Sequence, residues 1–201
     1  TLDKRFGVLI VCHANLCRSP MGERLARQAL TDRLGPAAGV EVTSAGTHAG
    51  PGRQMHPYAA QVLLENAADP GGFRTRRLAG ELVRGAGLVL TATRGQRSAC
   101  VTLEPAAVRR TFTIRQFARY AAALPDVAAG APGDLLDQIA VVRAGIPVAP
   151  AADDDLADPV GLPIEAFRRC AAELRAAFGV LARVIAPSPP AAAMARPAHH
   201  G

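Results

Sequence analysis

The amino-acid sequence predicts an α/β fold in which a parallel sheet carries helices on both of its faces. Residues 6–12, FGVLIVC, are an apolar run of strand length, which is typical of a strand buried on both faces. Residues 87–91, GLVLT, are another such run. Helical patterns lie between these runs, and alternating strands and helices favour a parallel sheet. Because ligands of such sheets bind beyond the carboxyl ends of the strands, we expect the functional site next to Cys12.

The remaining elements follow from turn residues and apolar spacing. Ser19 is suited to the N-cap of a helix and Pro20 to its first position, and Gly35 marks the end of that helix. Apolar residues at spacings of three and four indicate a last helix packed on the sheet. We therefore expect strands at 6–12, 40–47, 87–91 and 110–114, and helices at 20–34, 56–67, 76–85, about 134–144 and 163–185.

Length and composition predict one domain, residues 1–186, followed by a disordered tail, residues 187–201. The tail is rich in Ala and Pro and of low complexity. Apolar runs are too short for a membrane span, and we see no signal peptide. Four cysteines in 201 residues are too few for a disulfide scaffold. We therefore expect a cytoplasmic protein with reduced thiols and no membrane partner.

The formal net charge of +6 raises the question of a nucleic-acid partner. The arginines are scattered along the chain, and no basic run is interleaved with aromatic residues, as single-strand binding requires. We therefore expect no nucleic-acid partner. A basic surface would instead attract phosphorylated substrates.

The segment between the first strand and the first helix, residues 12–19, has the composition of an anion-binding loop. Successive backbone amides in such a loop can point inward, and the helix dipole adds positive charge at the same place. These surroundings favour a thiolate at Cys12, and the guanidinium of Arg18 can form two hydrogen bonds with an oxyanion. The pattern predicts phosphoryl transfer through a covalent cysteine intermediate, without metal or cofactor.

Cys12 and Arg18 also have alternative interpretations that involve no phosphoryl transfer. Cys12 can be a buried residue at a strand end and Arg18 a surface charge. A metal site of Cys12, His13 and Cys17 is a further alternative, but no second pair of ligands with zinc-like spacing accompanies it.

The stretch VCHANLCRSP resembles the phosphate-binding loop of the low-molecular-weight protein tyrosine phosphatases, V-C-x-G-N-x-C-R-S-P. The resemblance covers most of residues 6–186 in the order of that family, and only the tail and a lengthened 121–150 region fall outside it. It implies a four-stranded parallel sheet flanked by helices, with the phosphate-binding loop after strand 1. The other matching stretches are SAGT (44–47), GLVLT (87–91), TIRQFARY (113–120) and DDLADPVG (154–161).

The resemblance implies roles for individual residues. Cys12 matches the nucleophile, Arg18 the phosphate-binding arginine, and Asp158 the general acid, with Asp155 as the alternative. One carboxylic acid can protonate the leaving oxygen and later activate water. Without the resemblance, the acidic run at 153–158 would be interpreted as a solvated loop. The implied phosphate-binding loop comprises His13, Ala14, Asn15, Leu16, Cys17, Arg18 and Ser19, and the implied polar network that supports it comprises Asn15, Ser19 and Ser44.

Three positions depart from the family pattern. Ala14 replaces a glycine, which would cost on the order of 1 kcal/mol if the backbone there needs a positive φ. Phe73 replaces a histidine that supports the loop asparagine, so Asn15 needs another partner. Val160 replaces an aromatic residue that lines the substrate cleft, and His13 could stack on a substrate ring in its place.

These residues predict a cysteine-dependent phosphatase that acts on phosphotyrosine in proteins or on small aryl phosphates. Leu16 favours phosphotyrosine, because the members directed to phosphoarginine resemble this loop with Thr there. A thioredoxin-coupled arsenate reductase is an alternative, but Thr93 stands where one of its two relay cysteines would align, and only Cys100 fits the other. A phosphate- or phosphoprotein-binding module without catalysis is a further alternative. The oligomeric state is not predicted.

Cys17 is a candidate for redox control. Two thiols in one tight loop can come within disulfide reach, and a stabilised thiolate at Cys12 would be the first to oxidise. We expect Cys17 to trap the oxidised Cys12 as a disulfide. The alternative is that Cys17 only packs beneath the loop.

Overall fold

The fold is organised around a four-stranded parallel sheet with the strand order β2-β1-β3-β4. The computed structural model describes residues 6–35, 39–124 and 132–185, and the tail expected at 187–201 lies outside them. All neighbouring strands pair in parallel, as the sequence predicts. The strands are β1 (Phe6–Cys12), β2 (Val40–Gly46), β3 (Leu88–Thr91) and β4 (Thr111–Thr113).

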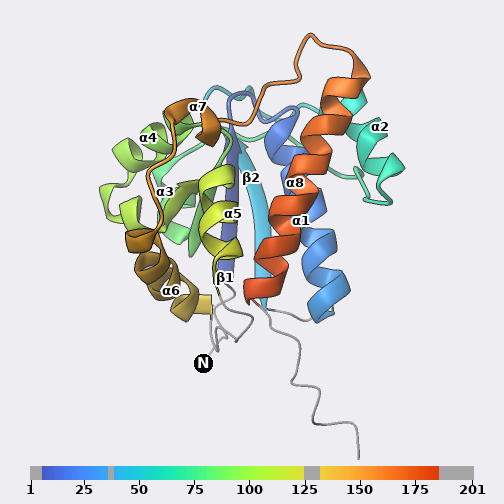
Figure 1. The fold of residues 1–201 in the computed structure, drawn as a ribbon. Coiled ribbons are helices and arrows are strands. Elements are labelled where there is room, and N and C mark those ends of the chain that lie inside the picture. Colours follow the sequence, from blue (N-terminus) through green and yellow to red (C-terminus); the bar gives the residue numbers. More distant parts are fainter. Residues whose placement is uncertain (1–5, 36–38, 125–131, 186–201) are drawn as a thin grey trace, which may run out of the picture.

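Helices cover both faces of this sheet (Figure 1). The apolar cluster on one face includes residues of α1 (Arg18–Leu34), α2 (Pro57–Glu65), α5 (Ile114–Ala122), α6 (Pro132–Gly145) and α8 (Ile164–Ile185). The cluster on the other face includes residues of α3 (Gly80–Gly85), α4 (Arg94–Leu103) and the 3₁₀ helix η1 (Pro105–Arg110). The short helix α7 (Ala151–Asp154) precedes α8. None of the helices in the described ranges is long and apolar enough to span a membrane.

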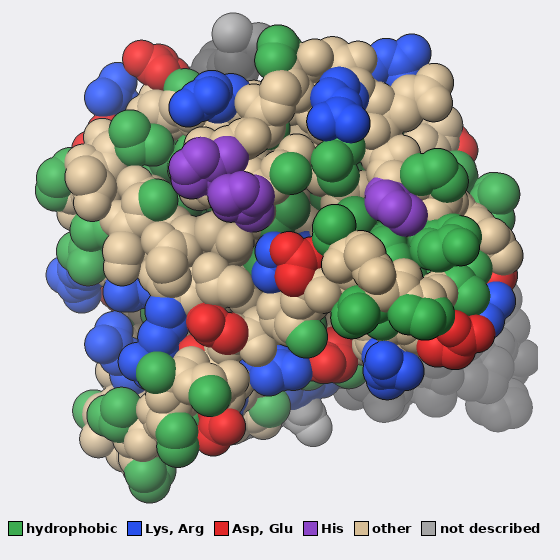
Figure 2. All heavy atoms as spheres, turned by 90° about the horizontal axis from the view of Figure 1, so that it is seen from above, with side chains coloured by type: hydrophobic (Ala, Val, Ile, Leu, Met, Phe, Trp, Pro, Cys, Tyr) green, Lys and Arg blue, Asp and Glu red, His purple; other side chains and the backbone are tan. Residues whose placement is uncertain are grey.

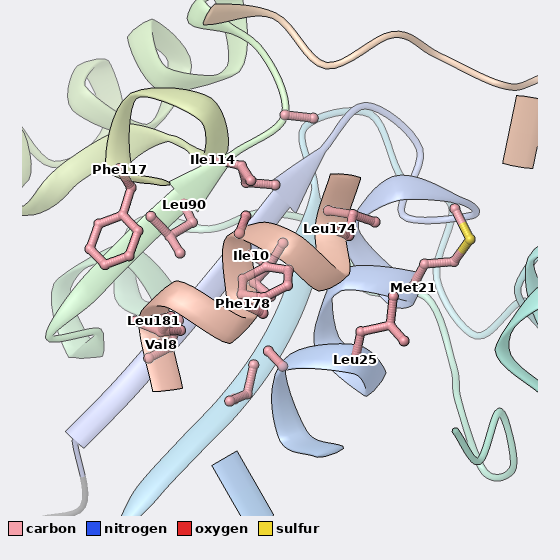
Figure 3. Close-up of a cluster of buried hydrophobic side chains, with 14 of the residues drawn as sticks. Val8, Ile10, Met21, Leu25, Leu90, Ile114, Phe117, Leu174, Phe178 and Leu181 are labelled. Atoms are coloured by element: carbon pink, nitrogen blue, oxygen red, sulfur yellow. The ribbon is translucent and has the colours of Figure 1, made fainter. Parts of the chain in front are cut away.

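The larger core lies between the sheet and helices α1, α5 and α8. Figure 3 shows side chains of α8, among them Phe178, meeting side chains of β1, β3 and α1. Phe178 is fully buried, and a side chain of this kind stabilises the fold by about 1.5–3 kcal/mol through burial. Gly22 of α1 permits the close approach, since a Cβ there would lie 3.2 Å from the Phe178 ring and 3.3 Å from Ile10. This packing holds the beginning of α1 against the end of β1.

The helix expected at 76–85 is shorter, because it begins only at Gly80. Residues 76–78 pair with the end of β2 instead. The amide of Gly46 donates to the carbonyl of Arg76 at 3.0 Å, and the amide of Leu78 donates to the carbonyl of Gly46 at 2.8 Å. This pairing satisfies backbone groups that a helix would otherwise have to satisfy.

Ser19 does not cap the first helix, contrary to the sequence prediction. The helix begins at Arg18, its N-cap residue is Cys17, and no side chain caps its end. Ser19 lies inside the first turn because the preceding loop passes directly into the helix at Arg18. Pro20 is then the third helical residue, where an amide would lack a helical partner in any case, so a proline costs no hydrogen bond.

Gly46, at the end of β2, lies directly against the loop that follows β1. A Cβ on Gly46 would lie 2.7 Å from the amide nitrogen of Asn15 and 2.7 Å from the carbonyl oxygen of His13. Both are backbone atoms, so a larger residue would displace the loop.

The segment before α8 is anchored by Asp154. The sequence suggested a solvated acidic loop, but only 1% of Asp154 is exposed. Its Oδ2 accepts from Arg94 Nε at 2.7 Å and from Gln116 Nε2 at 2.7 Å, and its Oδ1 accepts from Arg119 Nη2 at 2.6 Å. Burial opposes ionisation of this carboxyl, but the hydrogen bonds from Arg119, Arg94 and Gln116 outweigh it and lower its pKa. The ionised carboxylate of Asp154 therefore holds α7 against α4 and α5.

We expect Gly46→Ala to lower the free energy of unfolding by about 1–3 kcal/mol, because the new methyl group overlaps loop backbone. Chemical denaturation measures the change. Gly50→Ala is the matched control, since a Cβ there meets only the flexible end of Arg53 at 3.7 Å. Equal stabilities of the two variants would contradict the close contact.

We expect Asp154→Asn to destabilise the fold at pH 7 by on the order of 3 kcal/mol, because two partly exposed arginines lose their contacts with a fully buried counter-charge. The folded-state pKa of Asp154 is lowered, so its contribution is present above the ordinary aspartate pKa of about 3.9 and is lost as the pH falls through the folded value. The difference between wild type and variant should therefore shrink below about pH 4. Thermal unfolding measured against pH tests this, with exposed Asp153→Asn as control.

Candidate active site

The loop of residues 12–18 joins β1 to α1 at the carboxyl end of the sheet. This face is viewed from above in Figure 2, which shows histidine side chains in two places, with acidic and basic side chains near the middle. His13 and His48 stack with ring centroids 4.4 Å apart, and the amide of His56 donates to the carbonyl of Leu16. The loop predicted from the sequence therefore lies at the predicted edge of the sheet.

The backbone of this loop turns its carbonyl groups outward. Backbone amides of the neighbouring 47–56 segment donate to these carbonyls. The amide of Thr47 donates to Cys12 at 3.0 Å, that of His48 to His13 at 2.8 Å and that of His56 to Leu16 at 2.8 Å. The amides of residues 13–18 donate to no acceptor in the described parts of the chain. These donors without a protein acceptor lie just before α1, where the sequence predicts a nest for an oxyanion.

The left-handed backbone position of the loop is Asn15, with φ of 56°, and Ala14 is not among the residues with positive φ. The strain considered for Ala14 therefore does not arise. Asparagine is one of the few residues other than glycine that tolerates this conformation. Asn15 is also fully buried, so its side chain must find partners inside the protein.

Cys12 lies at the end of β1 and is 3% exposed. Its Sγ lies 2.9 Å from Ser19 Oγ, and Asn15 Nδ2 donates to the same hydroxyl at 2.8 Å. Because Asn15 occupies an acceptor position of Ser19, the hydroxyl can donate to the sulfur and stabilise a thiolate. The hydroxyl also lies 3.3 Å from the carbonyl oxygen of Ala45, which is its competing acceptor.

The polar network extends from Asn15 into the fold. Asn15 Nδ2 also donates to Ser44 Oγ at 3.0 Å, and Ser44 donates to Glu23 Oε2 at 2.6 Å. Asn15 Oδ1 accepts from the backbone amide of Arg76 at 2.9 Å. The structure thus brings Asn15, Ser19 and Ser44 together as the sequence predicted, and adds Glu23 and Arg76, which sequence reasoning missed.

Neither added residue has a sequence signal that singles it out. Glu23 is a helical glutamate that ends up 6% exposed, and it pairs with Arg27 at 2.9 Å. Phe73, at the position aligned with a supporting histidine, is buried and lies 6.0 Å from the Arg24 guanidinium. The partner that Asn15 needs is therefore a backbone amide rather than a side chain at position 73.

Arg18 reaches from α1 to the segment after α7. Its Nη1 donates to the carbonyl of Leu156 at 3.0 Å, and its Nη2 donates to Asp158 Oδ2 at 2.6 Å. The Arg18 side chain is 6% exposed and that of Asp158 is 45% exposed. Asp155, the alternative acid, instead accepts from the amide of Arg94 at 2.7 Å. The structure therefore brings Asp158, and not Asp155, to Arg18.

The other thiols lie in packed surroundings. Burial, and then the nearby negative charges of Cys12 and Asp158, raise the pKa of Cys17. Burial raises the pKa of Cys100 to about 12. Cys100 is fully buried in α4, and it packs in the cluster on the opposite face of the sheet from Cys12, while Thr93 caps that helix. No group of three or more possible metal-ligating side chains occurs among the described residues.

The family described as low molecular weight phosphotyrosine protein phosphatase matches residues 7–129 of this chain. A protein-arginine-phosphatase of Geobacillus stearothermophilus is 31% identical over 177 residues, covering 88% of this chain and 94% of that protein. A probable low molecular weight protein-tyrosine-phosphatase, EpsP, of Ralstonia nicotianae is 33% identical over 118 residues, covering 59% and 77%.

A solved structure of a low molecular weight protein tyrosine phosphatase from T. tengcongensis is 28% identical, with a TM-score of 0.65 over 88% of this chain and 97% of that chain. The match in sequence thus includes the loop and the sheet, and the match in structure extends over nearly the whole described fold. The chain therefore belongs to the low molecular weight phosphotyrosine protein phosphatase family of enzymes.

Proposed function

We propose that the chain is a cysteine-dependent phosphatase that hydrolyses phosphotyrosine and other aryl phosphate monoesters through a phosphocysteine intermediate. The observation that carries the proposal is the position of Cys12 at the base of a loop whose amides are free, with Arg18 and Asp158 paired at its edge. Binding alone would require neither the thiol nor the acid.

Substrate binding exchanges the partners of Arg18. The phosphoryl oxygens receive hydrogen bonds from the amides of residues 13–18, and two of them replace Leu156 and Asp158 as acceptors for the guanidinium. The released carboxyl of Asp158 is then free to face the leaving oxygen. Its side chain is almost half exposed, so this movement needs no repacking of the core.

The first chemical step transfers the phosphoryl group to sulfur. The Cys12 thiolate attacks phosphorus in line with the leaving oxygen, the S–P bond forms as the P–O bond breaks, and Asp158 gives its proton to the leaving phenolate. In the second step Asp158 takes a proton from water, the water oxygen attacks phosphorus, and the S–P bond breaks. The products are inorganic phosphate and the regenerated thiolate, which Ser19 stabilises.

Apolar side chains of the loop and of the segment after Asp158 support the proposed substrate class. Val160 and Leu162, which follow Asp158, are exposed apolar side chains, and Leu16 belongs to the loop itself. An aryl ring suits such surroundings. Phosphoarginine is the second candidate, because the Geobacillus stearothermophilus relative, which covers 88% of this chain, is a protein-arginine-phosphatase. A phosphoguanidinium group would have to use the Asp158 carboxylate as its counter-charge.

The first test compares peptides carrying phosphotyrosine and phosphoarginine. We expect kcat/KM to be at least about tenfold higher for phosphotyrosine, a difference of about 1.4 kcal/mol in transition-state binding. The rate should not change with a metal chelator. Cys12→Ser should abolish turnover while vanadate binding stays measurable, because the amides and Arg18 remain. Preference for phosphoarginine would favour the second candidate, and full activity of the serine variant would contradict the mechanism.

Asp158→Asn should have opposite effects on chemistry and on phosphate binding. Loss of the general acid should slow phenyl phosphate, a poor leaving group, by about 10²–10⁴-fold and an activated nitrophenyl ester much less. Inorganic phosphate should bind more tightly, since the variant lacks the carboxylate that competes for Arg18. Steady-state kinetics and phosphate inhibition measure both effects, with Asp155→Asn as control. Equal losses for all leaving groups would leave Asp158 only a structural role.

Cys17 should protect the enzyme from peroxide. Peroxide converts the Cys12 thiolate to a sulfenic acid, and the thiol of Cys17 then forms the disulfide with loss of water. After peroxide and then a dithiol reductant, wild type should regain most of its activity and Cys17→Ser much less. Cys170→Ser, another buried thiol of the same core, is the control. Equal recovery in all three proteins would mean that Cys17 only packs.

A further inference from the structure

A second cavity lies at the other end of the sheet from the phosphate-binding loop. It has a volume of about 350 Å³ and lies between α6 on one side and η1 with the beginning of β4 on the other, and we call it the α6 cavity. Figure 1 shows α6 low in the molecule, far from α7 and the loop at the top. The proposed catalysis uses none of its residues.

The floor of the α6 cavity is apolar. Phe112 of β4 and Ile139 of α6 contribute side chains that are 4% and 1% exposed, and Leu136 adds a partly buried one. The lining residues of α6 recur at intervals of three and four, from Leu136 to Ala144, so one face of the helix borders the cavity. Two of them are alanines, which leave the space open.

The rim of the α6 cavity is cationic. Arg109 of η1 and Arg143 of α6 both line it, and no carboxylate does. Neither guanidinium forms a hydrogen bond or an ion pair with any other residue in the described ranges. A third arginine is close, because burial and then the charge of Arg143 lower the pKa of Arg97. Positive charges facing one space without a counter-charge repel one another, and a bound anion would relieve this repulsion.

The cavity depends mainly on α6, which contributes five of its seven lining residues. The family match ends at residue 129, and α6 begins at Pro132. The helix that supplies Arg143 therefore lies outside the residues that the family model matches, as α8 also does. Its sequence provides a cationic residue and small side chains on the face that borders the cavity.

We propose that the α6 cavity binds a small amphipathic anion, with an apolar body against Phe112 and Ile139 and an oxyanion head between Arg109 and Arg143. Paired arginines bind oxyanions through charge-assisted hydrogen bonds. The volume lies at the small end of the usual range for ligand sites, about 300–1,000 Å³, which restricts the body to a short alkyl chain or a compact ring system. This site is independent of the proposed catalysis.

The absence of tryptophan from the chain allows a local measurement. Ala144→Trp places one fluorophore at the rim of the cavity, and Leu64→Trp places one on α2, at an exposed position elsewhere. Each variant is titrated with octanoate, with 1-octanol and with acetate, in buffer that contains enough inorganic phosphate to occupy the catalytic loop. We expect octanoate to change the emission of the Ala144→Trp variant saturably, at a concentration at least tenfold lower than either control compound. The Leu64→Trp variant should not respond.

Further variants test where the oxyanion head and the apolar body of the ligand bind. In the Ala144→Trp background, Arg109→Gln with Arg143→Gln should weaken octanoate binding at least tenfold, while Arg169→Gln, an exposed arginine of α8, should not. Octanoate, but not octanol, should raise the melting temperature of the unmodified chain, and Ala140→Leu, which fills the cavity and keeps both arginines, should remove that rise. The proposal is overturned if octanol binds equally well, if the charge variants keep full affinity, or if octanoate does not stabilise the unmodified chain. Hydrolysis of an aryl phosphate is measured in parallel, so failure of the cavity proposal is distinguishable from failure of the catalytic one.

Discussion

The buried side chain of Asn15 is the interaction on which the geometry of the phosphate-binding loop depends. It contacts Ser19 of α1, Ser44 of β2 and the backbone of Arg76, so one amide group joins segments that are far apart in the chain. The left-handed backbone at Asn15 turns the loop, and its side chain then holds that turn in place. Hydrogen bonds of a buried amide contribute strongly to stability, because breaking them would leave polar groups unpaired in a low-dielectric interior. The rest of the site follows from this turn, including the direction of the free amides.

Two aspartates near α7 differ in burial, and the proposed function gives them different roles. Asp154 is enclosed by Arg94, Arg119 and Gln116, and it keeps its charge because these donors outweigh the cost of burial. Asp158 lies four residues later, is almost half exposed and pairs with Arg18, where the proposed mechanism replaces it with a phosphate. A fixed anchor followed by a short free segment allows one carboxyl to move without disturbing the sheet. If both aspartates were exposed, the segment would lack its anchor, and if both were buried, Asp158 could not move.

The helix α6 adds a second environment to the same fold. Arg94 also donates to the carbonyl of Ala149, so the chain between α6 and α7 lies close to α4. The segment that lines the α6 cavity therefore leads directly to the segment that carries Asp158.

The sequence by itself determined the sheet and the reactive loop. Apolar runs of strand length predicted β1 and β3 because strands buried on both faces have no polar positions, and the spacing of Cys12 and Arg18 predicted an anion site because only a tight loop brings them together. The starts of α4 and α5 also have a local pattern in the sequence, since Thr93 with Gln96 and Thr113 with Gln116 form capping boxes. Only the tertiary structure decided which aspartate meets Arg18, why residues 76–78 pair with β2, and that Glu23 joins the polar network. Each of these depends on which distant groups are buried together, and hydrogen-bond partners across the fold leave no local pattern in the chain.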